Sequence, residues 1–95
     1  MSMLNKQVII RTINSGVHYG TLVSHQGQEA VLIQARRIWY WEGAFTLSAV
    51  ATKGISKKSK VSVLVPEILL TDVIEIIPCT PEAAECLSNI PAHLE

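Results

Sequence analysis

The chain has 95 residues, 48% of them hydrophobic, and a formal net charge of +0. This length is typical of one domain, so we expect a single domain over residues 1–95. A fold this small leaves much apolar surface exposed, and zero net charge gives little self-repulsion, so we also expect a homo-oligomer. The neutral charge argues against electrostatic capture of duplex nucleic acid, which needs a strongly basic face.

The sequence predicts neither a signal peptide nor a membrane-spanning segment. The first residues lack a basic stretch followed by a long apolar one, and the apolar runs stay far below the roughly 20 residues that cross a bilayer. We therefore expect a cytoplasmic protein with no membrane partner. In that reducing compartment, Cys79 and Cys86 make no disulfide framework. The three histidines show no metal-ligand spacing with the cysteines, so we expect neither a metal nor another cofactor.

The first half of the chain has the pattern of β-strands separated by turns. Residues 6–13 are rich in β-branched side chains and end at a turn-forming Asn-Ser-Gly sequence. Residues 17–24 alternate imperfectly, and Gly20 in their middle indicates a bulge or a close backbone approach. Residues 29–34 form a third strand after a glycine-containing turn, and this spacing favours a hairpin.

Two short helices are predicted in the second half. Residues 45–53 carry apolar side chains at helical spacing, with Thr46 as a plausible N-cap and Gly54 just past the end. A Thr-Pro pair starts the second helix, which covers residues 81–89.

Short strands are predicted at residues 61–65 and 73–77, with an apolar link at 68–70 between them. We expect the tail at 90–95 to be frayed. The fold class is mainly β (α+β), as a small antiparallel sheet or a partly open barrel with two short helices.

Aromatic side chains are concentrated between Arg36 and Phe45. If this segment is extended, alternate side chains share a face. One face then carries Arg37, Trp39 and Trp41. The other face carries Arg36, Ile38 and Tyr40, and it resembles a packed side from which the arginine head reaches solvent.

This aromatic segment has three possible roles. Arginine beside aromatic rings can bind a planar anion, because guanidinium pairs with phosphate while an indole or phenol stacks on a base. The same residues can fill the core of a small fold or form the centre of a protein interface. The candidate ligand-binding residues are Arg37, Trp39, Trp41, Arg36, Tyr40, Tyr19 and His18. A cluster at Lys53, Lys57, Lys58 and Lys60 either solvates a turn or adds phosphate contacts.

Catalytic fingerprints are absent from the sequence. It contains no nucleophile elbow, zinc-protease motif, P-loop or dinucleotide-binding motif. The histidines and acidic residues are scattered, and their spacing points to no acid–base pair. We therefore expect a protein that is not an enzyme and that has no catalytic residues.

The string RIWYWEGAFTLS, followed by VPEILLTDVIEIIPCTPEAAECL, resembles a family of small proteins encoded by tailed phages and prophages. The upstream segment RTINSGVHYGTLVSHQGQEAVLIQARR is similar to that family as well, so the likeness runs from Val8 to about Leu87. The resemblance implies a protein made in the cytoplasm of an infected bacterial host. It transfers no site residue.

Together these observations predict a non-enzymatic phage protein that binds a small anionic ligand. A counter-defence role is expected, in which the protein acts as a sponge that sequesters a nucleotide immune signal. One alternative is a phage inhibitor or accessory protein that acts by contact with a host protein. Another is a nucleic-acid-binding accessory protein, which would show steep salt dependence.

Overall fold

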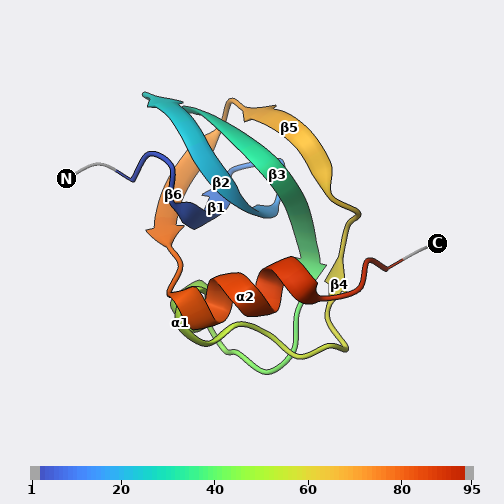
Figure 1. The fold of residues 1–95 in the computed structure, drawn as a ribbon. Helices are drawn as coiled ribbons and strands as arrows, with labels where there is room; N and C mark the ends of the chain where they lie inside the picture. The colour runs from blue at the N-terminus through green and yellow to red at the C-terminus, as the bar shows by residue number, and fades with distance from the viewer. Residues whose placement is uncertain (1–2, 94–95) are drawn as a thin grey trace.

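Figure 1 shows the computed structural model of the protein, which describes residues 3–93. Its elements are β1 (Gln7–Thr12), β2 (Val17–Gln26), β3 (Glu29–Tyr40), α1 (Leu47–Lys53), β4 (Lys60–Val61), β5 (Val65–Leu70), β6 (Val73–Pro78) and α2 (Pro81–Asn89). All strand pairs are antiparallel. The predicted mainly β fold with two short helices is therefore confirmed. Within residues 3–93, neither helix has the length and apolar character needed to cross a membrane.

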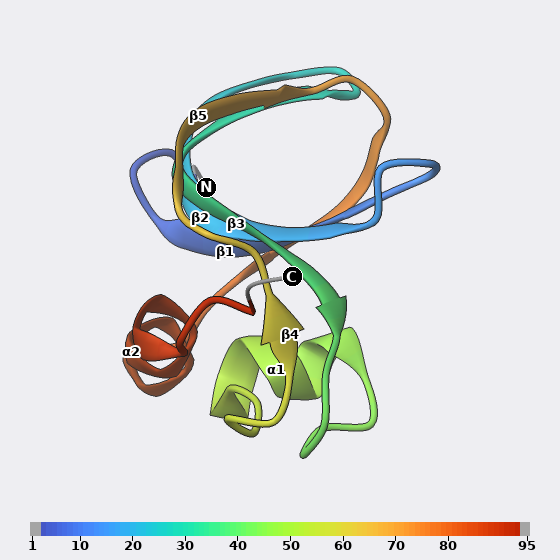
Figure 2. The ribbon, with the colours of Figure 1, turned by 90° about the vertical axis from the view of Figure 1, so that its right-hand side faces the viewer.

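The strands form one sheet in the order β4-β3-β2-β1-β6. β5 also pairs with β3, along residues 30–35, whereas β4 pairs with β3 at residues 38–40. The two short strands thus follow each other along the same edge of β3. Figure 2 shows that the sheet curls strongly, with β5 and β6 on opposite sides of the curl and both helices packed beneath it.

The central strands carry buried residues on both faces, and each face has its own hydrophobic cluster. β1 shows this division clearly, because Ile9 belongs to one cluster while Val8 and Ile10 belong to the other. The cluster against the helices contains Ile9, Tyr19, Ile38, Val50, Ala51, Ile55, Val61, Leu87 and Ile90. The cluster inside the curl contains Val8, Ile10, Leu22, Ala30, Leu32, Ala35, Leu70 and Val73. Burial on both faces explains why β1 is continuously apolar rather than alternating.

A bulge in β3 changes which of its side chains face the inside of the curl. Leu32 and Ala35 both belong to the inner cluster, although strict alternation would put them on opposite faces. Gln34 between them has a φ of 51°, and the β2–β3 register shifts across Gly20. A Cβ on Gly20 would lie 3.2 Å from the Ala35 Cα and 3.1 Å from the Ile33 carbonyl oxygen. The close backbone approach predicted at Gly20 is thus confirmed.

Both predicted helix starts are confirmed at their capping residues. The Thr46 hydroxyl accepts a hydrogen bond from the Ala49 N–H at 3.2 Å, so α1 begins at Leu47 rather than at Phe45. The Thr80 hydroxyl accepts from the Ala83 N–H at 3.1 Å at the start of α2. Each bond satisfies one of the N–H groups that a helix start leaves without a partner.

The strand predicted at 61–65 is wrong, because the chain leaves the sheet after Val61 and pairs again only from Val65. The apolar link predicted at 68–70 is part of β5. Apolar character did not indicate burial here, since the side chains of Val63 and Leu64 are exposed.

The expectation of a frayed tail needs correction for residues 90–93. Ile90 is buried in the cluster against the helices, and the backbone N–H of His93 donates to the Val61 carbonyl at 2.9 Å. Residues 94–95 lie outside the described part of the chain.

Candidate functional site

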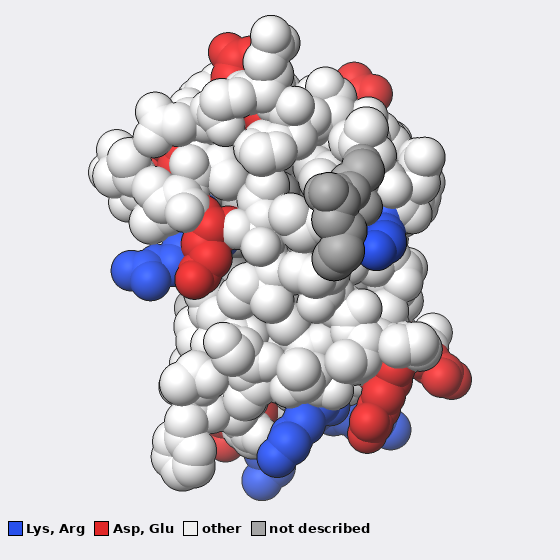
Figure 3. Space-filling view, turned by 90° about the vertical axis from the view of Figure 1, so that its left-hand side faces the viewer, with Lys and Arg blue, Asp and Glu red and all other residues white. Residues whose placement is uncertain are grey.

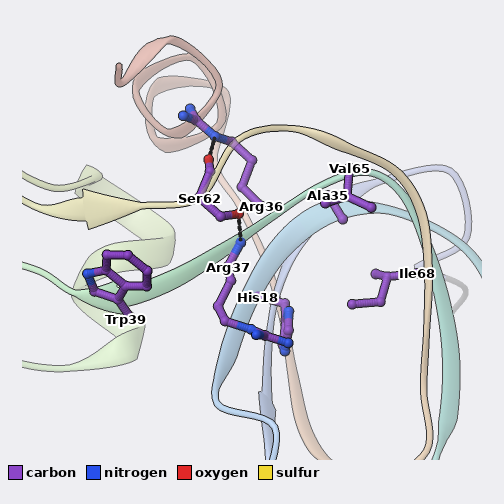
Figure 4. A pocket seen from close by; sticks show the side chains of 8 residues that line it. All are labelled: His18, Ala35, Arg36, Arg37, Trp39, Ser62, Val65 and Ile68. Carbon is purple, nitrogen blue, oxygen red and sulfur yellow. Dashed lines mark hydrogen bonds between the residues drawn. The ribbon is translucent and has the colours of Figure 1, made fainter. Parts of the chain in front are cut away.

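A pocket of about 200 Å³ opens between β2, β3 and the segment that leads into β5 (Figure 4). It is lined by His18, Ala35, Arg36, Arg37, Trp39, Ser62, Val65 and Ile68. Arg37 and Trp39 occupy alternate positions on β3, which puts both on the same side of that strand. Val65 of β5 pairs directly with Ala35 of β3, and these two residues form part of an apolar wall.

Arg37 presents an unpartnered cation to this pocket. The residue lies opposite His18 in the β2–β3 pairing, and its backbone N–H donates to the Ser62 hydroxyl at 2.8 Å. Its side chain is exposed, and within residues 3–93 its guanidinium makes neither a hydrogen bond nor an ion pair. The anchored backbone and the free head leave five N–H donors available to a ligand.

Arg36 points the other way, toward α2 (Figure 4). Its Nε donates to the Ser62 carbonyl at 3.0 Å, and its Nη1 donates to the Leu87 carbonyl at 3.0 Å. Burial lowers the pKa of this guanidinium, and nearby Tyr19 acts in the opposite direction. The predicted packed side is therefore correct, but a head in solvent is wrong. The cation instead satisfies a carbonyl in the last turn of α2, where helix geometry favours positive charge.

Trp39 forms one side of the pocket and is held from outside by the C-terminal segment. Its side chain is 45% exposed, and the His93 ring meets it edge-on, with 5.6 Å between ring centroids at an interplanar angle of 76°. An edge-on contact is a preferred geometry for two aromatic rings. The indole is therefore positioned by a neighbour while much of its surface stays accessible.

His18 is almost fully buried at the base of the pocket. Its Nε2 lies 2.9 Å from the Ser15 carbonyl oxygen. Desolvation by burial is the main effect and lowers the pKa of His18, with the Arg37 charge acting in the same direction. The Ser15 hydrogen bond and the Asp72 charge raise the pKa and offset part of this effect. The imidazole is thus held in its neutral form at neutral pH.

Three predicted ligand residues lie outside this pocket. Trp41 follows the end of β3 and packs against the helix-side cluster, so it does not share a face with Arg37. Tyr40 is exposed elsewhere, with the Lys60 Nζ 5.9 Å from its ring centroid. Tyr19 is buried, and its hydroxyl lies 3.0 Å from the Ala84 carbonyl oxygen and 2.7 Å from the Ser88 hydroxyl oxygen. The simple alternation fails because the register also shifts between Ile38 and Tyr40.

Sequence reasoning missed Ser62, whose hydroxyl and carbonyl orient both arginines. It also missed the pocket wall that β5 supplies through Val65 and Ile68. No local signal distinguishes Ser62 from any other serine in an apolar run. Its role depends on pairing with β3, a distant segment of the chain.

The lysine cluster lies apart from the pocket. Lys57 and Lys58 are exposed in the loop before β4, and neither they nor the other two lysines line the pocket. On the face shown in Figure 3, basic side chains are interspersed with acidic ones and separated by uncharged surface. No continuous basic tract crosses that face.

In the described part of the chain, the cysteines and the acidic residues form no recognisable chemical site. Within residues 3–93, no group of three His, Cys, Asp or Glu side chains is arranged to hold a metal ion. Cys79 and Cys86 are free thiols. Burial raises the pKa of Cys79 to about 12, and the Cys86 thiol donates to the Ile55 carbonyl at 3.2 Å. A thiol with so high a pKa is a poor nucleophile at neutral pH.

Comparison with known proteins identifies the family of this chain. No curated protein and no solved structure matches it. A family model described as "Domain of unknown function (DUF6948)" matches residues 5–87. That segment contains every residue that lines the pocket, whereas His93, which contacts Trp39, lies beyond it. Because the match covers most of the sequence, the chain belongs to the DUF6948 family.

Proposed function

We propose that this protein binds a small planar anionic ligand, of the nucleotide class, without turning it over. The observation that carries the proposal is the unpartnered Arg37 guanidinium beside the accessible Trp39 indole in one pocket. A guanidinium makes paired hydrogen bonds to phosphate or carbonyl oxygens. An indole face stacks on a base, and such stacking contributes about 1–3 kcal/mol per base.

The size of the pocket limits what it holds. Its volume is about 200 Å³, which is below the range of roughly 300–1,000 Å³ that encloses a drug-sized ligand. One base or one phosphate group fits, and the remainder of a nucleotide would extend outside. Two exposed apolar residues, Val63 and Leu64, lie in the chain between the lining residues Ser62 and Val65, and they are 54% and 48% exposed.

The exposed side chains of Val63 and Leu64 also support a proposed homo-oligomer. A second copy of the chain that covers Val63 and Leu64 would remove apolar surface from water and would also extend the shallow pocket. The formal net charge of +0 opposes such self-association very little. Contact with a host protein through this same surface is the second candidate function.

The resemblance to proteins encoded by tailed phages supports a proposed biological setting. In an infected bacterium, a stoichiometric binder of a nucleotide immune signal would lower its free concentration and so oppose host defence. This role needs tight binding but no catalysis. It therefore fits a pocket that offers donors and a stacking surface rather than a nucleophile.

Native mass spectrometry of protein purified from a bacterial host would report a co-purified nucleotide and the oligomeric state together. Titration calorimetry with that nucleotide, or with GMP and AMP as probes, then tests the site. Arg37→Ala is expected to weaken binding by about ten- to a hundred-fold, as for a lost charge-assisted hydrogen bond.

Arg11→Ala is the matched control, because Arg11 is an exposed arginine on β1 outside the pocket. It removes the same charge and is expected to leave affinity unchanged. Equal affinities for both variants and the wild type would remove Arg37 from any binding site.

A further inference from the structure

The hydrogen bond of His18 defines its tautomer. A carbonyl oxygen can only accept, so the Nε2 that lies 2.9 Å from the Ser15 carbonyl carries the proton. In a neutral imidazole the other nitrogen, Nδ1, is then an acceptor with a free lone pair. The charged groups that face the ring are Arg37 on β3 and Asp72 between β5 and β6, and burial keeps the ring neutral.

The Nδ1 atom of His18 is not used by the fold. It makes no hydrogen bond with any residue in 3–93. Every fully buried side-chain nitrogen or oxygen in the described chain has a hydrogen-bond partner. An atom without a partner, such as this Nδ1, is therefore not fully buried. The small exposed part of this ring, 1% of the residue, must therefore include Nδ1. His18 lines the pocket, so this small exposed edge is taken as the part of the ring that faces it.

We propose that His18 is the specificity-determining residue of this pocket, with its Nδ1 accepting a hydrogen bond from the ligand beside the group that Arg37 holds. This inference rests on the proposed function and deepens it. The two residues lie opposite each other on neighbouring strands, so their polar atoms serve adjacent atoms of one ligand. One residue offers only donors, and the other offers an acceptor.

This pairing selects a class of ligand. A fully deprotonated oxyanion such as sulfate satisfies Arg37 but meets the His18 lone pair with a second lone pair. The edge of a nucleobase instead presents an acceptor next to an N–H donor, as guanine does with its O6 and N1–H. Its ring would then stack on Trp39. The pocket is thus assigned to the base, and the phosphate lies outside it.

The first test needs no ligand and no variant. Nitrogen NMR of uniformly labelled wild-type protein at pH 7.5 distinguishes the two neutral tautomers and the charged form of each histidine. We expect His18 to carry its proton on Nε2. A proton on Nδ1 at that pH, alone or with one on Nε2, overturns the inference whatever the protein binds.

The second test compares GMP with sulfate in titrations of wild type, His18→Gln and His25→Gln. Glutamine can still donate to the Ser15 carbonyl from the Nε2 position but has no acceptor at the Nδ1 position. His25 is the matched control, because it lies on the same strand, bonds a backbone carbonyl at 3.0 Å and is exposed outside the pocket. Circular dichroism of each variant checks that the fold is retained.

We expect His18→Gln to weaken GMP binding about three- to ten-fold, as for one neutral hydrogen bond. Its weak affinity for sulfate should not change, and His25→Gln should bind both probes like the wild type. GMP binding that depends on Arg37 but not on His18 overturns this inference and leaves the proposed function intact. Failure of GMP to bind overturns this inference, and failure of GMP, AMP and any co-purified nucleotide to bind overturns the proposed function as well.

Discussion

His18 and Arg37 lie opposite each other on β2 and β3 and line one pocket, although the first side chain is buried and the second is exposed. The two side chains differ in burial because they lie at different positions along the curl of the sheet. His18 lies near the β1–β2 turn, where Ser15 and Asp72 enclose it. Arg37 reaches outward from a longer side chain. A neutral acceptor and a cationic donor are thereby placed side by side at one opening.

The two neighbouring arginines should differ sharply in their effect on stability. Arg36→Ala removes two hydrogen bonds from a buried cation to backbone carbonyls. We expect it to lower the free energy of unfolding by about 1.5–3 kcal/mol in urea titrations. Arg37→Ala removes no intramolecular bond, so its effect should stay within about 0.5 kcal/mol. Similar losses for both variants would contradict the assignment of their roles.

Gly54 should not tolerate a side chain. Its φ of 82° and ψ of −163° lie in a region that is nearly restricted to glycine, which costs another residue about 1–3 kcal/mol. An added Cβ would also lie 2.6 Å from the Cys86 Sγ. We therefore expect Gly54→Ala to lower the melting temperature more than Gly27→Ala, whose φ is also positive but whose Cβ would meet nothing within 4 Å. Equal shifts in the two variants would show that contact with Cys86 is unimportant.

Tyr19 should behave as a structural residue rather than a ligand contact. Its buried hydroxyl bonds the Ala84 carbonyl and the Ser88 hydroxyl, which ties β2 to α2. Tyr19→Phe is expected to cost about 1–2 kcal/mol of unfolding free energy, because the partners lose a buried bond. The affinity for a nucleotide should be unchanged when it is measured under conditions in which the variant is fully folded. Tyr40→Phe, at an exposed position, is the control and should alter neither quantity.

His18 should make stability depend on pH in mildly acidic solution. Burial lowers its pKa in the folded protein below the usual 6.5. As the pH falls through 6.5, the unfolded chain therefore takes up a proton at this residue before the folded protein does. The stabilisation is complete above that pH and is lost progressively down to the folded-state pKa. Each unit of lowering corresponds to about 1.4 kcal/mol.

The measurement is urea unfolding at a series of pH values from 7.5 to about 5, a range set by the histidine pKa. His18→Gln should lose less stability over this range than the wild type does. His25→Gln should follow the wild-type curve. Parallel curves for all three proteins would show that His18 titrates alike in the folded and unfolded states.

The proposed self-association should depend on the exposed apolar residues between β4 and β5. Leu64→Lys places a charge where a second copy would pack, and such a charge is costly to bury without a partner. In size-exclusion chromatography with light scattering, we expect the wild type to exceed the 10.4 kDa chain mass and the variant to approach it. Ile74→Lys alters an equally exposed residue on β6 and should not change the mass. A monomeric wild type would end this proposal.

Much of the fold follows from the sequence alone, because the signals involved are local. The hydroxyls of Thr46 and Thr80 cap their helices by accepting hydrogen bonds from N–H groups three residues further along the chain. Gly20 marks the close approach of two strands, since any side chain there would meet the neighbouring backbone. Continuous and alternating apolar runs predict a mainly β domain. Such features depend on contacts within one turn of helix or on the character of a single residue.

The site depends on the tertiary structure. Arg36 finds its carbonyl acceptor on Leu87, 51 positions along the chain, and both arginines are oriented by Ser62. Alternation along the aromatic segment separates the face of Arg37 from that of Arg36, as predicted. It does not show that the Arg36 head bonds α2, or that Ser62 and β5 complete the pocket. These arrangements arise only when β2, β3 and α2 are packed together and each buried polar group must find a partner.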